Sequence, residues 1–234
     1  MKRVKIHVCS LVTIIILAAS LYTPAVALTC YFDIVPVPDE DMSEYIRNST
    51  IEIAHSEAKD LSITCFDVSN SGLIAIGFHS HSGIVHIYNN DGSFLRRYQF
   101  KVNGKFSVGF IGDDLAVYFL RGNLIKVFNS EGQLAHVYTL PSTPRNINNT
   151  HKLLQRTTKE INGKTYTLES DIPNWTSFSR LVRTNEDGSR DILYDATFAH
   201  NFKTICSLFF IIFFFALCIR GVIQQSIYKA QQEN

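Results

Sequence analysis

The chain has 234 residues, and its 22 lysines and arginines almost balance its 21 aspartates and glutamates, so the net charge at pH 7 is +1. Between residues 28 and 203 the balance is mildly acidic, with 17 basic and 20 acidic residues, which leaves no basic surface for a nucleic-acid partner. The sequence contains no Gly-x-Ser-x-Gly, Walker-type, dinucleotide-binding or His-Glu-x-x-His motif, so it indicates no specific catalytic activity.

Residues 1–27 have the organisation of a secretory signal peptide. Three basic residues precede an apolar run at 8–19, and residues 25–27 read Ala-Val-Ala, the small-x-small pattern of a cleavage site. We therefore expect cleavage after this tripeptide, with an uncleaved signal anchor as the alternative. Lipidation of Cys30 is disfavoured, because the threonine before it fits a lipoprotein signal poorly. With either outcome the following residues are delivered across the membrane.

Residues 28–60 form an N-terminal extracytoplasmic segment ahead of the main domain. Within it, Thr50–Ala54 is a candidate strand and Asp39–Arg47 a short helix or loop. Cys30 and Cys65 are the two cysteines outside the apolar segments, and in an oxidising compartment they can form one disulfide. The alternative is that both remain thiols, with Cys65 as a small buried residue in a strand, and the sequence does not decide between the two.

Residues 61–200 contain three copies of a hairpin pattern. Each copy has an alternating strand, an Asn-x-Asp-Gly or Asn-x-Glu-Gly turn, and a second strand that ends in an aromatic residue. Glycine favours this hairpin because it accepts the positive φ that such turns need. The copies are Ile84–Tyr98, Leu124–Tyr138 and, more weakly, Ser179–Tyr194.

Two further strands precede each of the first two hairpins, so each unit is expected to have four short strands. The candidate strands are Ile63–Val68, Leu73–Phe78, Phe106–Phe110 and Leu115–Phe119. The first two hairpin turns are 40 residues apart, which is the length of a propeller blade. The next interval is 56 residues, so we expect an insertion, which we assign to the polar stretch Thr143–Thr158.

This pattern resembles the repeats of the β-propeller superfamily, in particular the NHL and related six-bladed kinds. Ser71–Ile76 and Ile84–Leu95 carry the resemblance, which covers residues 60–140 well and 160–195 loosely. It implies a mainly β fold of antiparallel, blade-like sheets. Closed propellers have about four to eight blades, and three units are present here. We therefore expect a partial, open propeller or sheet stack, or a domain completed by another chain, because open sheet edges invite pairing.

Residues 203–223 are predicted to form a transmembrane helix. Thr204–Ile219 contains no charged side chain and includes five phenylalanines between 209 and 215, so it has no polar face to present to water. With Arg220 extended toward the headgroups, the segment reaches the roughly 20 residues that a bilayer requires. The positive-inside rule then places the tail, 224–234, in the cytoplasm and the main domain outside the cell membrane. The chain has one span, or two if the N-terminal segment is retained.

Two groups of side chains could bind a metal ion, although neither is a complete site. His79 and His81 share a strand face and lie close to His86, but serines and a glycine between them indicate a turn. Asp113 and Asp114 form a carboxylate pair without the other donors of a calcium loop, so a solvated turn is the better interpretation. We therefore assign no catalytic, cofactor or metal site.

Surface features of the exported region are few. The glycosylation pattern Asn-x-Ser/Thr begins at Asn48, Asn148 and Asn174, and its occupancy depends on the source of the protein. Trp175 is the one tryptophan, and a packing role for it is favoured over an exposed contact.

The expected function is that of a membrane-anchored, extracytoplasmic, propeller-like binding protein without catalysis. Its expected partners are the bilayer and either another protein or a second copy of the chain. One alternative is a propeller-type metal-dependent enzyme to which His79, His81 or Asp113 contributes. Another is a structural subunit whose partial propeller is completed by a partner membrane protein.

Overall fold

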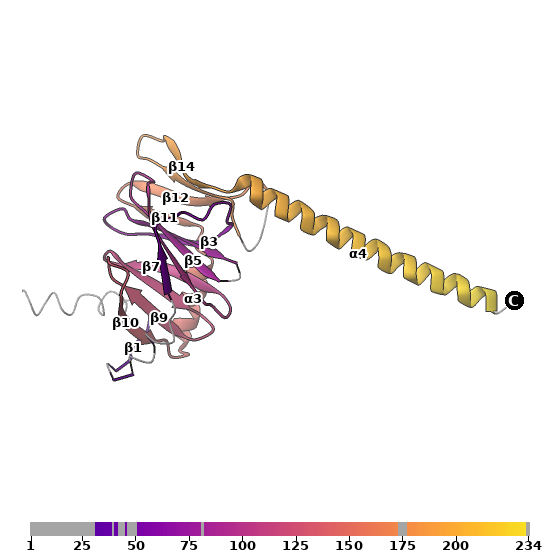
Figure 1. Ribbon diagram of the computed structural model, residues 1–234, viewed down its shortest axis with the longest axis horizontal. Coiled ribbons are helices and arrows are strands. Elements are labelled where there is room, and N and C mark those ends of the chain that lie inside the picture. Colours follow the sequence, from indigo (N-terminus) through magenta and orange to yellow (C-terminus); the bar gives the residue numbers. More distant parts are fainter. Residues whose placement is uncertain are drawn as a thin grey trace, which may run out of the picture.

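The computed structural model describes residues 31–38, 40–41, 45, 51–80, 82–172 and 177–232, with side chains as far as Arg220 (Figure 1). Some of the predictions made above concern residues outside these ranges: the signal peptide, Cys30, Asn48, His81, Asn174 and Trp175.

Three antiparallel sheets make up the domain, and each contains a four-stranded meander. Unit 1 is β3 (Ile63–Val68), β4 (Ile74–His79), β5 (Gly83–Tyr88) and β6 (Phe94–Phe100). Unit 2 is β7 (Phe106–Ile111), β8 (Asp114–Phe119), β9 (Leu124–Phe128) and β10 (Leu134–Thr139). Unit 3 is β11 (Thr158–Ile161), β12 (Lys164–Glu169), β13 (Arg180–Thr184) and β14 (Arg190–Asp195). The prediction of a mainly β fold with propeller-like antiparallel sheets is confirmed.

Units 1 and 2 each carry a fifth strand on their last strand. The strand β2 (Ile51–Ala54) pairs with β6, and the short strand β1 (Val35–Pro36) pairs with β10. Among the residues that the structure describes, β14 has no such neighbour, so the edge of unit 3 is unpaired.

The repeated hairpin turns form for the reason that the sequence indicates. Gly92, Gly132 and Gly188 have φ values of +85°, +85° and +80°, which L-residues with side chains rarely adopt. In each turn the glycine N–H donates to the carbonyl of the preceding turn asparagine over 2.9 Å. The three hairpins are therefore copies in backbone geometry as well as in sequence.

Unit 1 lies in the middle of the stack, between unit 3 and unit 2 (Figure 1). Along β5 the side chains alternate, so that Ile84 and Tyr88 pack toward unit 3 while Val85 and Ile87 pack toward unit 2. The order of the units in space, 3–1–2, thus differs from their order in the chain. Two apolar layers, one on each face of unit 1, hold the stack together.

The outer face of unit 2 is covered by segments from elsewhere in the chain. Phe32 is buried against it, and Ile34 and Leu153 pack on the same cluster. The residues between units 2 and 3 form α3 (Pro144–Leu154), which supplies Leu153 and begins with the side chain of Thr143 as its N-cap. The extra length between the second and third hairpins is therefore a helix that helps to cover the outer face of unit 2.

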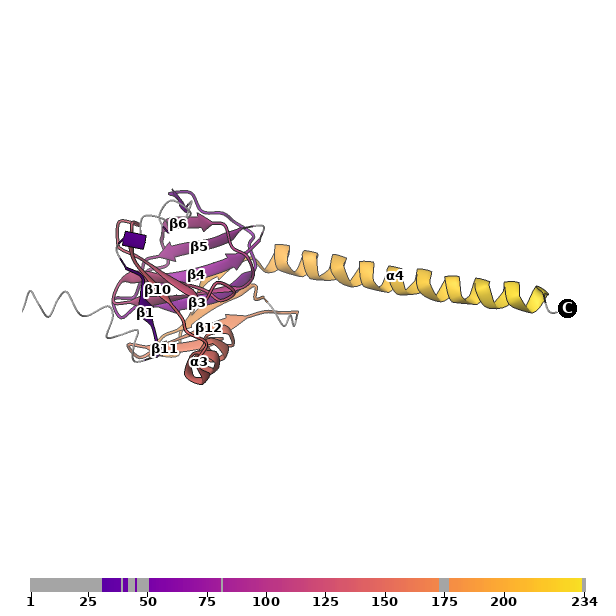
Figure 2. The same ribbon diagram turned by 90° about the horizontal axis from the view of Figure 1, so that it is seen from below.

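The helix α4 (Thr197–Gln232) begins two residues after β14 and projects away from the domain (Figure 2). Its first 24 residues, Thr197–Arg220, are long and apolar enough to cross a membrane, and the window that qualifies is not buried against the domain. This is the helix that the sequence predicts near the C-terminus.

Candidate functional site

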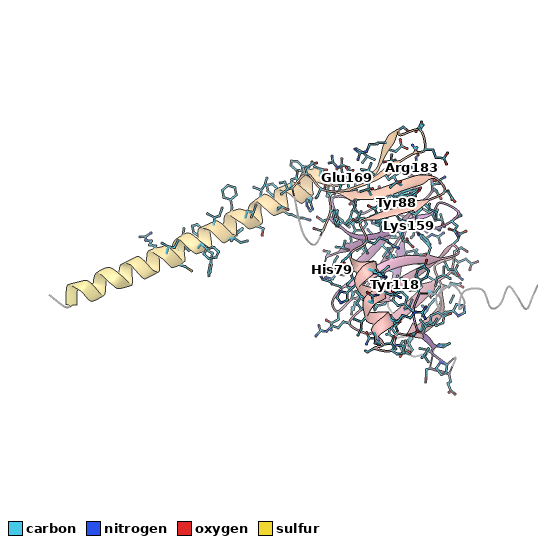
Figure 3. All side chains as sticks on the ribbon, turned by 180° about the vertical axis from the view of Figure 1, so that it is seen from behind. His79, Tyr88, Tyr118, Lys159, Glu169 and Arg183 are labelled. Atoms are coloured by element: carbon cyan, nitrogen blue, oxygen red, sulfur yellow. The ribbon has the colours of Figure 1, made fainter. Side chains whose placement is uncertain are left out.

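The two ends of the sheet stack differ in their connections. The tight glycine turns lie at one end, which we call the distal face. The first strands of the units, β3, β7 and β11, begin at the other end, and α4 leaves from there (Figure 1). We call this end the proximal face. Figure 3 shows His79 on the side of the domain nearer α4.

A pocket of about 990 Å³ lies between the proximal face and the first turns of α4. Its floor comes from the starts of β3 and β7, the end of β4, and the residues that follow α3. Phe106 and Phe178 supply apolar wall on the domain side, and Leu208 and Ile211 supply it on the helix side. The sheets and the candidate membrane span therefore share one cavity, which we call the proximal pocket.

The ionisable side chains that line the proximal pocket are all basic. They are His79, Lys105, His200 and Lys203, and no aspartate or glutamate lines the pocket among the described residues. Lys105 and Lys203 are exposed, and neither forms an ion pair within the part of the chain that the structure describes. Two positive charges thus face a shared cavity, and the described residues place no carboxylate beside them.

Hydroxyl groups and the amide of Gln155 make up the rest of the polar lining. The hydroxyls come from the domain and from the helix: Ser62, Thr64, Ser80, Thr157, Ser177, Thr204 and Ser207. A hydroxyl group can donate one hydrogen bond and accept two, so this lining can serve a ligand that is rich in oxygen atoms.

His200 attaches α4 to the domain. The residue is 1% exposed, with Nδ1 lying 3.0 Å from Ser62 Oγ and Nε2 lying 3.1 Å from Ser170 Oγ. A neutral imidazole offers one donor and one acceptor, which suits a bridge between two hydroxyls. The bridge fixes the helix where Lys203 and Ser207 reach the pocket.

A second group of charges lies between the first strands of the three units. Asp67 of β3 has a side chain that is 6% exposed, and its Oδ1 lies 2.7 Å from Lys159 Nζ and 3.0 Å from Arg156 Nη2. Its Oδ2 accepts the Phe110 N–H over 2.8 Å. Burial is the main reason that the pKa of the neighbouring Tyr118 is raised, and the Asp67 carboxylate adds to it.

The two cations of this group also bind backbone carbonyls. Lys159 donates to Val68 O over 2.5 Å, and Arg156 donates to Phe66 O over 2.7 Å. The group, which we call the Asp67 cluster, joins β3, β7 and the start of β11, so it links all three units. Because its charges are already paired and hydrogen-bonded, we assign it a structural role.

The histidine of β5 lies in the packed interior rather than at a site. His86 is fully buried between the rings of Phe78 and Phe94, whose centroids lie 4.7 Å and 5.4 Å from its own. Its Nδ1 lies 3.1 Å from the hydroxyl of Tyr88, which donates to Glu57 over 2.6 Å. Burial, with the charge of Arg97, lowers the pKa of His86 to about 4. The residue is neutral near pH 7 and has no access to solvent.

The residues considered as metal ligands are not brought together. His79 lies at the proximal face, His86 lies in the core, and Asp113 lies in the distal turn between β7 and β8, where it accepts a 2.5 Å hydrogen bond from Ser71. Asp114 is the first residue of β8, and His81 lies outside the described residues. Within the described ranges, no three His, Cys, Asp or Glu residues are arranged to hold a metal ion.

Cys65 is a free thiol, buried in β3, and burial raises its pKa to about 11. Of the two roles that the sequence allows for Cys65, a disulfide or a small buried thiol, the structure therefore shows the second.

Asn148 of α3, which begins one of the glycosylation patterns, is exposed, so its amide is accessible.

Comparison with solved structures gives low similarity. Virginiamycin B lyase from Staphylococcus aureus aligns with 62% of this chain at 18% identity and a TM-score of 0.28. Its catalytically inactive variant with quinupristin gives a TM-score of 0.27 at 18% identity, also over 62% of this chain. A streptogramin B lyase aligns with 63% at 16% identity and a TM-score of 0.27.

This chain covers 45% of each of those lyase chains, which is less than half of their length. No protein-family model matches the sequence, and no curated protein matches it. The assignment of a propeller-like fold therefore rests on the sheets and their packing. Function has to be argued from the residues of this chain.

Proposed function

We propose that this protein is a single-span membrane protein that holds a three-unit, propeller-like binding domain outside the cytoplasm. The observation that carries the proposal is the position of the proximal pocket, which is lined by the domain and by the apolar helix α4 together. A binding role accounts for the open pocket without requiring a catalytic group. The domain belongs, in this proposal, with the NHL-like blade repeats that its hairpins resemble.

The proposed orientation rests on charge. Arg220 and Lys229 follow the apolar segment, so the positive-inside rule places the C-terminal end in the cytoplasm and the sheets on the other side. The first 27 residues, read as a signal peptide, would deliver the domain there.

Labelling of single cysteines tests this topology in intact cells with a maleimide that does not cross membranes. Asp113→Cys lies in the exposed distal turn, and Gln231→Cys lies in the last turn of α4. We expect the first variant to be labelled in intact cells and the second only after permeabilisation. The parent chain controls for its own cysteines, which are Cys9, Cys30, Cys65, Cys206 and Cys218. The reverse pattern, or labelling of neither variant until lysis, would overturn the proposed topology.

A second role, as a subunit that pairs with another chain, is favoured by the edge of unit 3. The last strands of units 1 and 2 are covered at their outer edges by β2 and β1, whereas the outer edge of β14 has no neighbouring strand within the described residues, and Ile192 on β14 is 58% exposed. An unpaired strand is a template for strand addition. Ile192→Lys should reduce any dimer or complex seen by light scattering in detergent. An unchanged assembly state would remove this role.

A further inference from the structure

We infer that the proximal pocket binds the phosphate headgroup of an anionic membrane lipid, with the lipid's acyl chains lying along Leu208 and Ile211 of α4. The inference rests on the proposed function, because it requires α4 to be in a bilayer. It goes further by naming the chemical class of the ligand.

The polar lining of the pocket matches a phosphate group. Lys105 from the start of β7 and Lys203 from α4 face the same cavity, and the structure pairs neither with a carboxylate in its described part. Lysine binds phosphate as a point charge, and hydrogen bonds to an ionised group are about twice as strong as neutral ones. Hydroxyls such as those of Ser80 and Ser207 can donate to the remaining phosphate oxygens.

The position of the pocket along α4 matches the boundary of a bilayer. Lys203 is followed by 16 uncharged residues before Arg220, so the apolar stretch begins at Thr204. At about 1.5 Å per residue, Leu208 and Ile211 lie roughly 8 Å and 12 Å farther along the helix axis than Lys203. A ligand in this pocket therefore meets ammonium and hydroxyl groups at headgroup level and hydrocarbon side chains deeper in the membrane. A phosphate-bearing lipid has this distribution of polarity, and a soluble phosphate does not.

The structure also holds the helix in the position that such a site requires. His200, fixed by Ser62 and Ser170, lies one turn before Lys203, and Thr204 Oγ1 donates to the His200 carbonyl over 2.9 Å. The first turns of α4 are thereby attached to the domain, so Lys203 approaches the cavity in a defined direction. His79, at the end of β4, adds a further basic group on the opposite wall.

Native mass spectrometry of the full-length protein in detergent micelles tests the inference with phosphatidic acid as the probe. We expect phosphatidic acid to bind, and the double variant Lys105→Gln/Lys203→Gln to bind it about tenfold less well, since each lost charge-assisted contact weakens binding. The matched control, Lys101→Gln/Lys152→Gln, removes two exposed lysines outside the pocket and should stay within twofold of the parent. The variant Lys105→Arg/Lys203→Arg keeps the charge and should retain binding.

Competing ligands separate the sources of the phosphate group. Diacylglycerol, which lacks the phosphate, should bind far less than phosphatidic acid, and inorganic phosphate should not displace the lipid at equal concentration. Equal binding by the pocket and control variants would overturn the inference, because the lipid would then be surrounding the helix non-specifically. Equal binding of diacylglycerol, or displacement by inorganic phosphate, would also overturn it.

The lipid-binding and labelling experiments distinguish failure of the lipid site from failure of the proposed topology. If Asp113→Cys is not labelled in intact cells, the proposed function fails whatever the micelle experiment shows. If the labelling pattern is as expected and the double variant binds lipid like the parent, the lipid site alone is wrong. Circular dichroism of each variant checks that the sheets are retained.

Discussion

Two groups of basic side chains in this protein differ in how their charges are balanced. In the Asp67 cluster, Lys159 and Arg156 surround a carboxylate that is nearly buried, and both donate to backbone carbonyls as well. In the proximal pocket, Lys105 and Lys203 have no carboxylate beside them within the described residues. Lys159 and Arg156 are thus paired within the folded domain, whereas Lys105 and Lys203 remain available to a ligand.

The difference has a physical origin in solvent access. A charge that leaves water must be paired and hydrogen-bonded, or the desolvation cost exceeds what the fold can supply. An exposed lysine has no such requirement, because water solvates it. The lysines around the proximal pocket stay solvated and have no carboxylate beside them within the described residues. The packing of the sheets therefore does not require them.

Breaking the Asp67 cluster should have the largest effect on stability. Asp67→Asn keeps the shape of the side chain but leaves Lys159 and Arg156 without a counter-charge. We expect the free energy of unfolding to fall by about 3 kcal/mol, the lower part of the range for a broken buried pair, since both cations are partly exposed. Denaturant unfolding in detergent, followed by near-ultraviolet circular dichroism, measures it. Asp113→Asn, in the exposed distal turn, is the control. A loss below about 1 kcal/mol at Asp67 would contradict the structural role.

Lowering the pH should reduce the free energy of unfolding, because the folded protein keeps His86 buried and uncharged. The pKa of His86 is about 4 in the folded protein and about 6.5 in the unfolded chain, so the unfolded state binds more protons between these values. Stability is therefore lost as the pH falls from 6.5 toward 4, by up to about 3 kcal/mol from this residue. His86→Leu should show a shallower pH dependence across that window, and His79→Gln should match the parent. Parallel curves for the parent and His86→Leu would show that His86 is not the group responsible.

The repeat architecture could be predicted because its signals are local. The turns at Gly92 and Gly132 need a positive φ, and a glycine in the sequence indicates such a position. The alternation along β4 and β5 assigns each side chain to a face of the sheet. The number of units and the four-strand pattern follow from these signals. The sequence does not indicate the strands β11 and β12, because Thr158–Glu169 has polar residues at most positions.

The order of the units in space and the two charged groups could not be predicted in the same way. Nothing in the local pattern says that unit 3 packs on unit 1, since this depends on which apolar faces meet after the segment that contains α3 has led the chain from unit 2 to unit 3. Lys105 and Lys203 are 98 positions apart in the chain, and only the attachment of α4 through His200 brings them to one cavity. One signal was present: Asp67, between Phe66 and Val68 in an apolar strand, is a carboxylate that needs a buried partner.

Overpacking next to the pocket tests whether the core and the pocket are coupled. A Cβ at Gly77 would lie 2.4 Å from Cys65 Sγ and 3.1 Å from a ring carbon of Phe106, which also lines the pocket. We expect Gly77→Ala to lower the free energy of unfolding by about 2 kcal/mol and to weaken lipid binding by shifting Phe106. At Gly122 the nearest atom is 3.7 Å away, so Gly122→Ala is the control. Loss of stability with unchanged lipid binding would show that the two regions are independent.

The smallest expected effect separates the two groups of cations most directly. Lys105→Gln and Lys203→Gln should each change the free energy of unfolding by less than about 0.5 kcal/mol, because solvated lysines without ion pairs contribute little to the folded state. Lys159→Gln is the matched comparison: it removes a 2.7 Å contact with a nearly buried carboxylate, so it should cost about 1 to 2 kcal/mol. The same chemical change is thus made in both groups, and unfolding in detergent compares them. If Lys105→Gln proved as costly as Lys159→Gln, Lys105 would belong to the structural framework, and its charge would not be available to a ligand.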